Sequence, residues 1–283
     1  MENIQEYWAK IPLIMRAIIN GIIVQVVGFI ALVKILPLNL SIIPNVPWAI
    51  LPLGICLWLY WSYFGGSGWP KKSSQLRKNY RRAHAIDPSL YPRILYVGLL
   101  YSATILCIST LQFSYKALPV EALGLVPMLF ELPLWTSIPL ALLAALFVGM
   151  GEEMSYRGYM QVPLEERYKP YIFLAVPAGI FALSHGLDLQ NLPIFFFVSL
   201  GWGVIAWCTG SIWPGIIIHF IIDGVGFIWG ILALDDLKYV MEYSIAENGW
   251  TWGFQMLAIL TLVLIILTLW SLNGLRKLTK SHF

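Results

Sequence analysis

The stretch LWTSIPLALLAALFVGMGEEMSYRGYM, residues 134–160, joins a long apolar run to a cluster of ionisable groups. Residues 134–150 contain no Asp, Glu, Lys or Arg, and Glu152, Glu153 and Arg157 follow shortly after. Because roughly 18–20 apolar residues cross a bilayer as a helix, this run is expected to lie in hydrocarbon. An ionised side chain near the bilayer centre costs on the order of 2.5–3.5 kcal/mol. The three charged groups are therefore expected to face the interior of a helical bundle.

The composition of the whole chain is typical of a membrane protein. Of its 283 residues, 59% are hydrophobic and 12% are charged, and its mean hydropathy is +0.74. A soluble domain carries roughly twice this charged fraction. We expect an all-α fold, a polytopic integral-membrane helical bundle, with residues 1–283 forming a single integral-membrane domain. Hydropathy predicts about eight transmembrane helices, near 11–36, 43–64, 94–113, 135–158, 171–187, 192–209, 212–232 and 252–272.

The distribution of charge predicts the orientation of these helices. Residues 65–93 form a basic loop with seven of the 18 Lys and Arg residues and one acid, whereas residues 233–251 are acidic. Cytoplasmic loops collect Lys and Arg, so the basic loop is expected to be cytoplasmic. An even number of spans then puts the N- and C-termini in the cytoplasm as well. We expect a multi-pass protein of a bacterial plasma membrane.

The remaining polar segments are expected to lie outside the hydrocarbon and to have no catalytic role. The basic loop is interpreted as an anchor for this orientation, and no nucleic-acid partner is expected. Residues 114–134 are a candidate interfacial helix. Glu165, Glu166 and Arg167 are interpreted as solvated charges of a cytoplasmic loop.

Six polar residues in the second half of the chain fall within predicted spans. They tolerate this depth only if they face one another or water inside the bundle. The economical prediction is one shared polar cavity, which these residues line: Glu152, Glu153 and Arg157 of the fourth span, His185 of the fifth, and His219 with Asp223 of the seventh.

Helical spacing suggests different roles for the two glutamates. Glu153 and Arg157 are i, i+4 with the acid first, the favoured order for a pair within one helix. Glu152 lies about 100° away around the helix and has no such partner. We therefore expect Glu153 to be the structural carboxylate and Glu152 the working one.

The histidines complete the predicted site. His219 and Asp223 are also i, i+4, so both project from one face of their helix. Phe181 precedes His185 by one turn and is expected to shield the site from lipid.

These residue types fit the hydrolysis of an amide bond. A carboxylate in a cavity of low dielectric can take a proton from water and deliver it to a leaving amine. Glu152 and His185 would activate the water, while His219 would donate to the developing oxyanion, with Asp223 beside it. The alternative is a non-enzymatic membrane protein, such as an immunity factor, scaffold or proton-coupled carrier, that uses the same cluster structurally or as a proton relay.

Three short motifs give the cluster a family resemblance. The segments EEMSYR (152–157), FALSH (181–185) and HFIID (219–223) match EExxxR, FxxxH and HxxxN/D patterns in that order. In this order, within about eight predicted spans, the chain resembles the CPBP family over roughly residues 135–230. This family comprises the Rce1-like type II CAAX prenyl endopeptidases and the bacteriocin-processing Abi proteins.

The resemblance implies an intramembrane endopeptidase whose catalytic core is residues 135–230. By analogy, Glu152 and His185 activate water, His219 and Asp223 line the oxyanion site, and Glu153 and Arg157 support them. The substrate would be a membrane-associated or lipidated peptide or protein, and membrane lipids would be its other partners. The best-studied members carry Asn where this chain has Asp223, so Asp223 is expected to be protonated or paired with His219.

A metal is not required by these residues. None of the four histidines is followed by Glu, so the HExxH spacing of helical zinc proteases is absent. No cofactor is predicted with certainty. If Zn²⁺ were bound, its ligands would be His185, His219 and Glu152.

The depth of Glu152 requires one further prediction. If the fourth helix ended near Met150, Glu152 would lie at the membrane surface and could not meet His185. We therefore predict that this helix continues past Met160 and that the fifth helix starts in a funnel that faces the cytoplasm.

Overall fold

The computed structural model describes residues 4–115, 127–130, 132–186 and 191–280. Within these residues all regular elements are helical, and six helical segments are long and apolar enough to cross a membrane. The predicted all-α, polytopic helical architecture is confirmed. The six segments are α2 (Leu13–Ile42), α5 (Tyr91–Tyr115), the continuous segment of α7 (Leu134–Glu152), η4 (Glu153–Met160) and α8 (Gln161–Glu165), α10 (Leu192–Thr209), α11 (Trp213–Leu232) and α14 (Trp252–Lys280).

Two of the predicted spans form shorter apolar helices. These helices, α3 (Ile50–Phe64) and α9 (Pro170–Ser184), have 15 residues each. At about 1.5 Å per residue each is roughly 22 Å long, less than the hydrocarbon thickness of about 30 Å. The described residues therefore contain six helices of spanning length, and the other two of the eight apolar helices fall short of it.

The remaining helices are short; the first of them precedes the first long helix and the others lie between apolar helices. They are α1 (Ile4–Lys10), η1 (Lys71–Ser73), α4 (Ser74–Arg81), η2 (Pro88–Leu90), α6 (Pro127–Phe130), α12 (Leu234–Glu242) and α13 (Ile245–Asn248). Most of the candidate interfacial helix at 114–134 lies outside the described residues.

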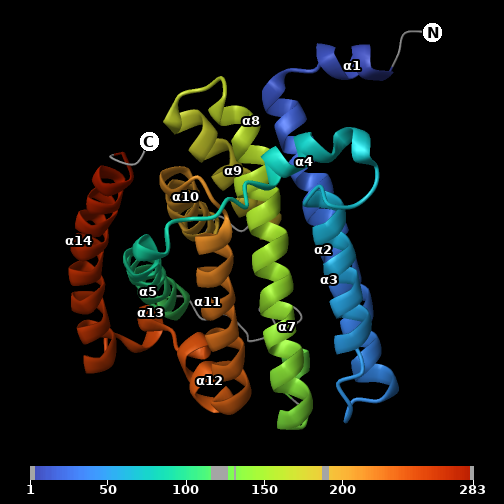
Figure 1. Ribbon diagram of the computed structural model, residues 1–283. Helices are drawn as coiled ribbons and strands as arrows, with labels where there is room; N and C mark the ends of the chain where they lie inside the picture. Colours follow the sequence, from blue (N-terminus) through green and yellow to red (C-terminus); the bar gives the residue numbers. More distant parts are fainter. Residues whose placement is uncertain (1–3, 116–126, 131, 187–190, 281–283) are drawn as a thin grey trace.

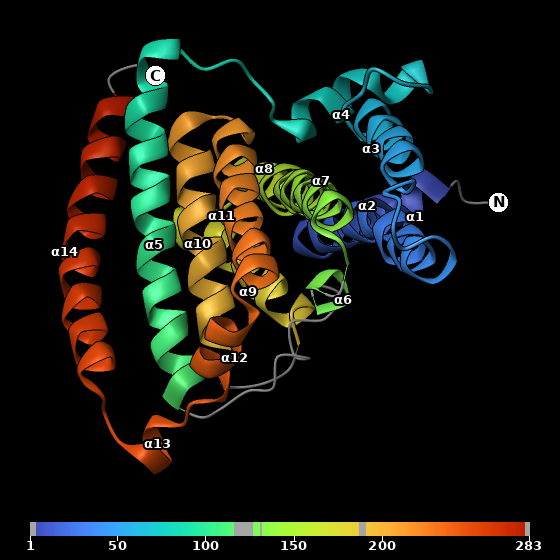
Figure 2. The same cartoon turned by 90° about the horizontal axis from the view of Figure 1, so that it is seen from below.

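The segment of α7, η4 and α8 runs through the middle of the molecule (Figure 1). Viewed from below, α2 and α3 lie on one side of α7, and α10, α11, α5 and α14 lie on the other (Figure 2). Two buried apolar clusters fill the space on these two sides, and η4 contributes side chains to both. The segment with the two glutamates is therefore enclosed by packed helices.

A glycine allows α7 and α11 to approach closely. A Cβ atom at Gly149 would lie 3.3 Å from the His219 Cβ and 3.3 Å from the Ile216 carbonyl oxygen. Small residues at such crossings let helix backbones approach within a membrane. This approach brings His219 of α11 beside the end of α7.

Both chain ends, α4 and α8 lie at one end of the bundle, whereas α12 and α13 lie at the other (Figure 1). At the first end, Arg82 Nη1 lies 2.6 Å from Glu165 Oε1, and the Arg82 carbonyl accepts a hydrogen bond from Ile212 N. The prediction that Glu165 is solvated is wrong, because its side chain is 20% exposed and pairs with Arg82. Glu166 and Arg167 are exposed, as expected.

The predicted continuation of the fourth helix is confirmed. Helical structure runs without interruption from Leu134 to Glu165, a span of 32 residues. Glu152 therefore lies well inside this helical segment and not at its end. A π-helix over Glu153–Met160 interrupts the α-helical geometry there, which the sequence pattern did not predict.

Candidate active site

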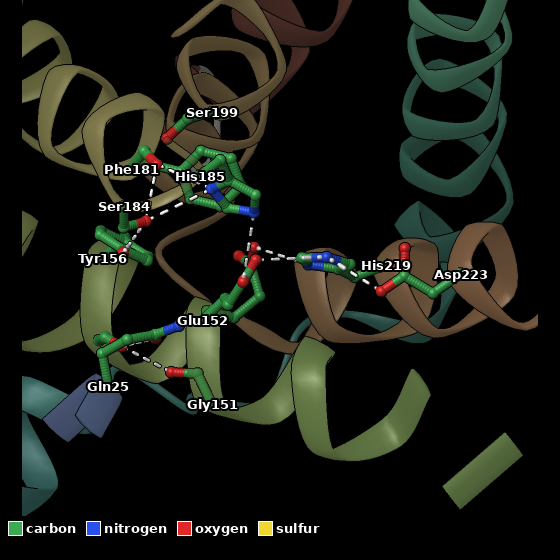
Figure 3. Close-up of polar contacts among 12 residues, drawn as sticks. Gln25, Gly151, Glu152, Tyr156, Phe181, Ser184, His185, Ser199, His219 and Asp223 are labelled. Atoms are coloured by element: carbon green, nitrogen blue, oxygen red, sulfur yellow. Dashed lines mark hydrogen bonds and ion pairs between the residues drawn. The ribbon is translucent and has the colours of Figure 1, made fainter. Parts of the chain in front are cut away.

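The predicted polar residues meet around Glu152 (Figure 3). Glu152 is the last residue of α7, and Glu153 and Arg157 lie in η4. His185 directly follows α9, whereas His219 and Asp223 lie on α11. The structure thus brings together the side chains of three chain segments that the sequence assigned to one cavity.

The carboxylate of Glu152 lies between two imidazole rings. Its Oε1 is 3.7 Å from His185 Nε2, and its Oε2 is 3.5 Å from His219 Nε2. Asp223 Oδ2 lies 3.4 Å from the same Nε2 of His219. These separations exceed the usual 2.7–3.2 Å of an N–H···O hydrogen bond. The groups therefore face one another without forming short hydrogen bonds.

Glu153 contacts both Arg157 and His219. Its Oε1 lies 3.2 Å from Arg157 Nη1, as the i, i+4 spacing predicts. The same oxygen lies 3.6 Å from His219 Nδ1, a contact that the sequence pattern did not predict. Both glutamates therefore reach one imidazole, although a regular α-helix would direct them to different faces.

Arg157 is the buried cation of the site, with a side chain that is 1% exposed. Its Nη2 donates to the carbonyl and to the hydroxyl of Ser199 at 3.1 and 3.0 Å. The guanidinium carbon lies 5.2 Å from the Phe181 ring centre and 5.4 Å from the Trp202 ring centre. Ser199 and Trp202 belong to α10 and to no motif, so no local signal in the sequence could have identified them.

A backbone contact defines the tautomer of neutral His185. Its Nδ1 lies 2.8 Å from the carbonyl oxygen of Phe181, which can only accept a hydrogen bond. Nδ1 therefore carries the proton, and the lone pair of Nε2 faces Glu152. The centre of the His185 ring lies 4.3 Å from the centre of the Phe181 ring and 4.3 Å from that of the Phe195 ring, with planes 33° and 23° apart. Phe181 is buried, and it separates His185 from Arg157 rather than bordering lipid.

A cavity of about 310 Å³ opens onto the cluster. Glu152, His185, His219 and Asp223 line it, together with polar residues of α5. Glu153 and Arg157 lie behind these residues and do not line it, so the prediction that all six polar residues line the cavity is wrong for these two. Apolar side chains of α5 and α10 form much of the rest, although α5 lies outside the predicted core. These wall residues include Ile105, Leu106, Phe113, Ile194, Phe195 and Val198.

Several buried polar atoms of the site make no hydrogen bond within the protein. Most buried polar groups in folded proteins are hydrogen-bonded. A cluster of buried polar atoms without such bonds therefore marks a place where water or substrate can form hydrogen bonds with the protein. These atoms are Glu152 Oε2, both carboxylate oxygens of Glu153, Arg157 Nη1, His219 Nδ1 and Trp202 Nε1.

The described residues give no positive indication of a metal centre. Across the part of the chain that the structure describes, no group of three or more His, Cys, Asp and Glu side chains could hold a metal ion. The candidate zinc set of His185, His219 and Glu152 is therefore not supported, and no step below uses a metal.

The fold and the site define a multi-pass helical membrane protein with two buried glutamates, a buried histidine and a second, partly exposed histidine in one cluster. Residues 133–225 match the family model described as Type II CAAX prenyl endopeptidase, Rce1-like. The resemblance that the three motifs indicate is thus confirmed for this region, which contains all the clustered residues from Glu152 to Asp223. No curated protein and no solved structure matches the chain. The family match supports a membrane endopeptidase that acts on a peptide or protein substrate.

Proposed function

We propose that this protein is an intramembrane endopeptidase in which Glu152, assisted by His185, activates a water molecule. The observation that carries the proposal is the position of the Glu152 carboxylate, 3.7 Å from His185 Nε2 and 3.5 Å from His219 Nε2 beside the cavity. A water between Glu152 and His185 can donate one hydrogen bond to each, since the carboxylate and the bare Nε2 are both acceptors.

The reaction then follows ordinary amide hydrolysis. Glu152 takes a proton from the water, whose oxygen attacks the carbonyl carbon of the scissile peptide bond. His219 donates a hydrogen bond to the resulting oxyanion. The proton held by Glu152 passes to the leaving nitrogen as the C–N bond breaks. The products are a free carboxylate and a free amine.

The other residues support these steps. Arg157 holds Glu153 through their 3.2 Å contact, and Glu153 in turn lies against His219. Asp223 pairs with His219 at 3.4 Å, which is one of the two states expected for this residue. We further propose that residues 1–283 act as one integral-membrane domain, with residues 133–225 as its catalytic core and both termini in the cytoplasm.

The cavity suggests the kind of substrate. Its walls from α5 and α10 are mostly apolar, so the site fits a peptide that carries apolar side chains or a lipid group. The test is a cleavage assay with purified protein in lipid nanodiscs, using matched peptides with and without a lipidated cysteine. Mass spectrometry identifies the products, and each reaction is repeated with a chelator.

We expect cleavage of membrane-associated peptides at a rate that the chelator does not change. Loss of cleavage in chelator that returns on adding Zn²⁺ would contradict the metal-free mechanism. Failure of folded protein to cleave any peptide, with transport or stability altered by Glu152→Ala, would favour the non-enzymatic alternative.

A further inference from the structure

A chain of hydrogen bonds runs behind His185, on the side away from Glu152 (Figure 3). The Tyr156 hydroxyl donates to Ser184 Oγ at 2.8 Å, and the Ser184 hydroxyl donates to the Phe181 carbonyl at 2.7 Å. The same carbonyl accepts from His185 Nδ1 at 2.8 Å, and Ser184 Oγ lies 3.3 Å from this nitrogen. The hydrolysis described above uses neither Tyr156 nor Ser184.

His185 occupies a position that needs such support. It is the residue after the last turn of α9, its side chain is 28% exposed, and Gly186 beyond it has a φ of +117°. The 3.7 Å separation from Glu152 is too long for a hydrogen bond that could fix the ring. Stacking on Phe195 limits the plane of the ring but permits sliding within that plane. Directional contacts must therefore define where Nε2 points.

Tyr156 connects the two catalytic elements. It lies four residues after Glu152 in the same continuous helical segment, whereas Ser184 is the residue before His185. The Tyr156 side chain is buried, and its ring packs edge-on against Phe181 with centres 5.1 Å apart. A hydrogen bond from Tyr156 to Ser184 therefore ties the segment that carries Glu152 to the helix end that carries His185.

The direction of these hydrogen bonds also controls the tautomer. Because Tyr156 donates to Ser184 Oγ, the proton of Ser184 points to the Phe181 carbonyl. The Phe181 carbonyl oxygen and Ser184 Oγ then both act as hydrogen-bond acceptors toward His185 Nδ1, which keeps the proton on Nδ1. Without the Tyr156 hydroxyl, Ser184 could rotate and donate to Nδ1, which would favour the tautomer with the proton on Nε2. The Nε2 atom of that tautomer cannot accept a hydrogen bond from the water that Glu152 activates.

We propose that Tyr156 and Ser184 are positioning residues that hold His185 with its proton on Nδ1 and its Nε2 lone pair toward Glu152. The consequence for catalysis rests on the proposed endopeptidase function. The effect on the histidine itself does not depend on that function.

The kinetic test uses two substitutions that each remove one side-chain hydroxyl from this chain of hydrogen bonds. Tyr156→Phe and Ser184→Ala are each expected to lower kcat roughly 10- to 100-fold with little change in KM, because a misplaced His185 no longer orients the attacking water, which slows chemistry more than binding. The kcat of the double variant should be no lower than that of the slower single variant, since each single substitution already removes the Tyr156–Ser184 hydrogen bond. Ser184→Thr keeps the hydroxyl and should restore most of the rate.

Tyr159→Phe is the matched control. Tyr159 lies in the same π-helical segment, is buried, and donates to the Phe64 carbonyl at 2.6 Å, away from His185. This variant also loses one buried hydrogen bond, so it should lower the thermal unfolding midpoint as Tyr156→Phe does while leaving kcat near the wild-type value. A similar loss of kcat in Tyr159→Phe would show that the rate follows stability, and would overturn the proposal.

A second measurement needs no catalysis. The chain has four histidines, so ¹⁵N-histidine NMR of the protein in detergent micelles can resolve them after assignment by substitution. The signals of His185 should report the Nδ1–H tautomer in the wild type and a mixture of tautomers in Tyr156→Phe. If this shift occurs but the wild type cleaves no peptide, the positioning proposal stands and the endopeptidase proposal fails. An unchanged tautomer and an unchanged kcat in both variants would overturn the positioning proposal.

Discussion

His219 is the residue on which the carboxylates of the site converge. Its Nε2 faces Glu152 at 3.5 Å and Asp223 at 3.4 Å, and its Nδ1 faces Glu153 at 3.6 Å. Carboxylates thus lie near both ring nitrogens, each of which can donate a hydrogen bond. We propose that this ring donates the hydrogen bond to the oxyanion and that the three carboxylates fix its orientation.

The role of Asp223 can be tested by two substitutions. Asp223→Asn keeps an oxygen acceptor beside His219, so kcat is expected to stay within about tenfold of the wild-type value. Asp223→Leu has a similar shape but no acceptor, and we expect a loss of roughly 100-fold because His219 is no longer held. Steady-state kinetics of both purified variants provide the comparison. Wild-type activity in Asp223→Leu would show that this carboxylate takes no part.

The identities of these residues were predictable from sequence because polar groups are costly in hydrocarbon. Glu152, Glu153, Arg157, His185 and His219 stand out against apolar surroundings, and burial in one cluster offsets their cost. The partners that hold them were not predictable in the same way. Ser199 and Trp202 are ordinary residues of an apolar helix, and only the packing of α10 against η4 gives them a role.

At the level of elements, the π-helix and the crossing of α11 determine where the glutamates point. π-helical turns are rare and often occur at functional sites. The spacing of the motif assumes a regular α-helix, so it predicted the contact of Glu153 with Arg157 but not its contact with His219. Gly215 of α11 lies directly against Glu153, and a Cβ there would overlap the Glu153 carboxylate carbon at 2.6 Å.

Gly215→Ala should therefore disturb the site through packing alone. The added methyl must displace Glu153, and overpacking of this kind typically costs about 1–3 kcal/mol. We expect a lower unfolding midpoint and a lower kcat, measured by thermal scanning and peptide cleavage. Gly226→Ala on the same helix is the control, since a Cβ there meets no atom within 4 Å. Equal behaviour of the two variants would contradict this description of the crossing.

At the level of the whole molecule, hydropathy predicted much of the architecture. The long apolar helices coincide with predicted spans because each buries its backbone hydrogen bonds in lipid or protein. Outside the polar cluster, the contacts between distant segments were not predictable, because they depend on packing. Ser211 Oγ donates to the His84 carbonyl at 2.8 Å, which links the basic loop to the turn between α10 and α11 across 127 positions of sequence.

The orientation in the membrane is a prediction that labelling can test. Lys72 lies at the end of the bundle with α4, whereas Asp235 lies in α12 at the other end, and both residues are exposed (Figure 1). Single cysteines at these positions would be introduced after replacing Cys56, Cys107 and Cys208 with Ala. We expect an impermeant maleimide to label position 72 only from the cytoplasmic side and position 235 only from the opposite side. Labelling of both positions from one side would contradict the predicted topology.

The central claim is that the Glu152 carboxylate activates water, and the most direct test is peptide cleavage by Glu152→Gln. The substitution keeps the shape of the side chain but removes its basicity. Glu166→Gln on the exposed surface is the matched control for the change in charge. We predict that Glu152→Gln, with a wild-type unfolding midpoint, loses about a thousandfold or more of kcat while Glu166→Gln loses none. Turnover at the wild-type rate by folded Glu152→Gln would contradict the account.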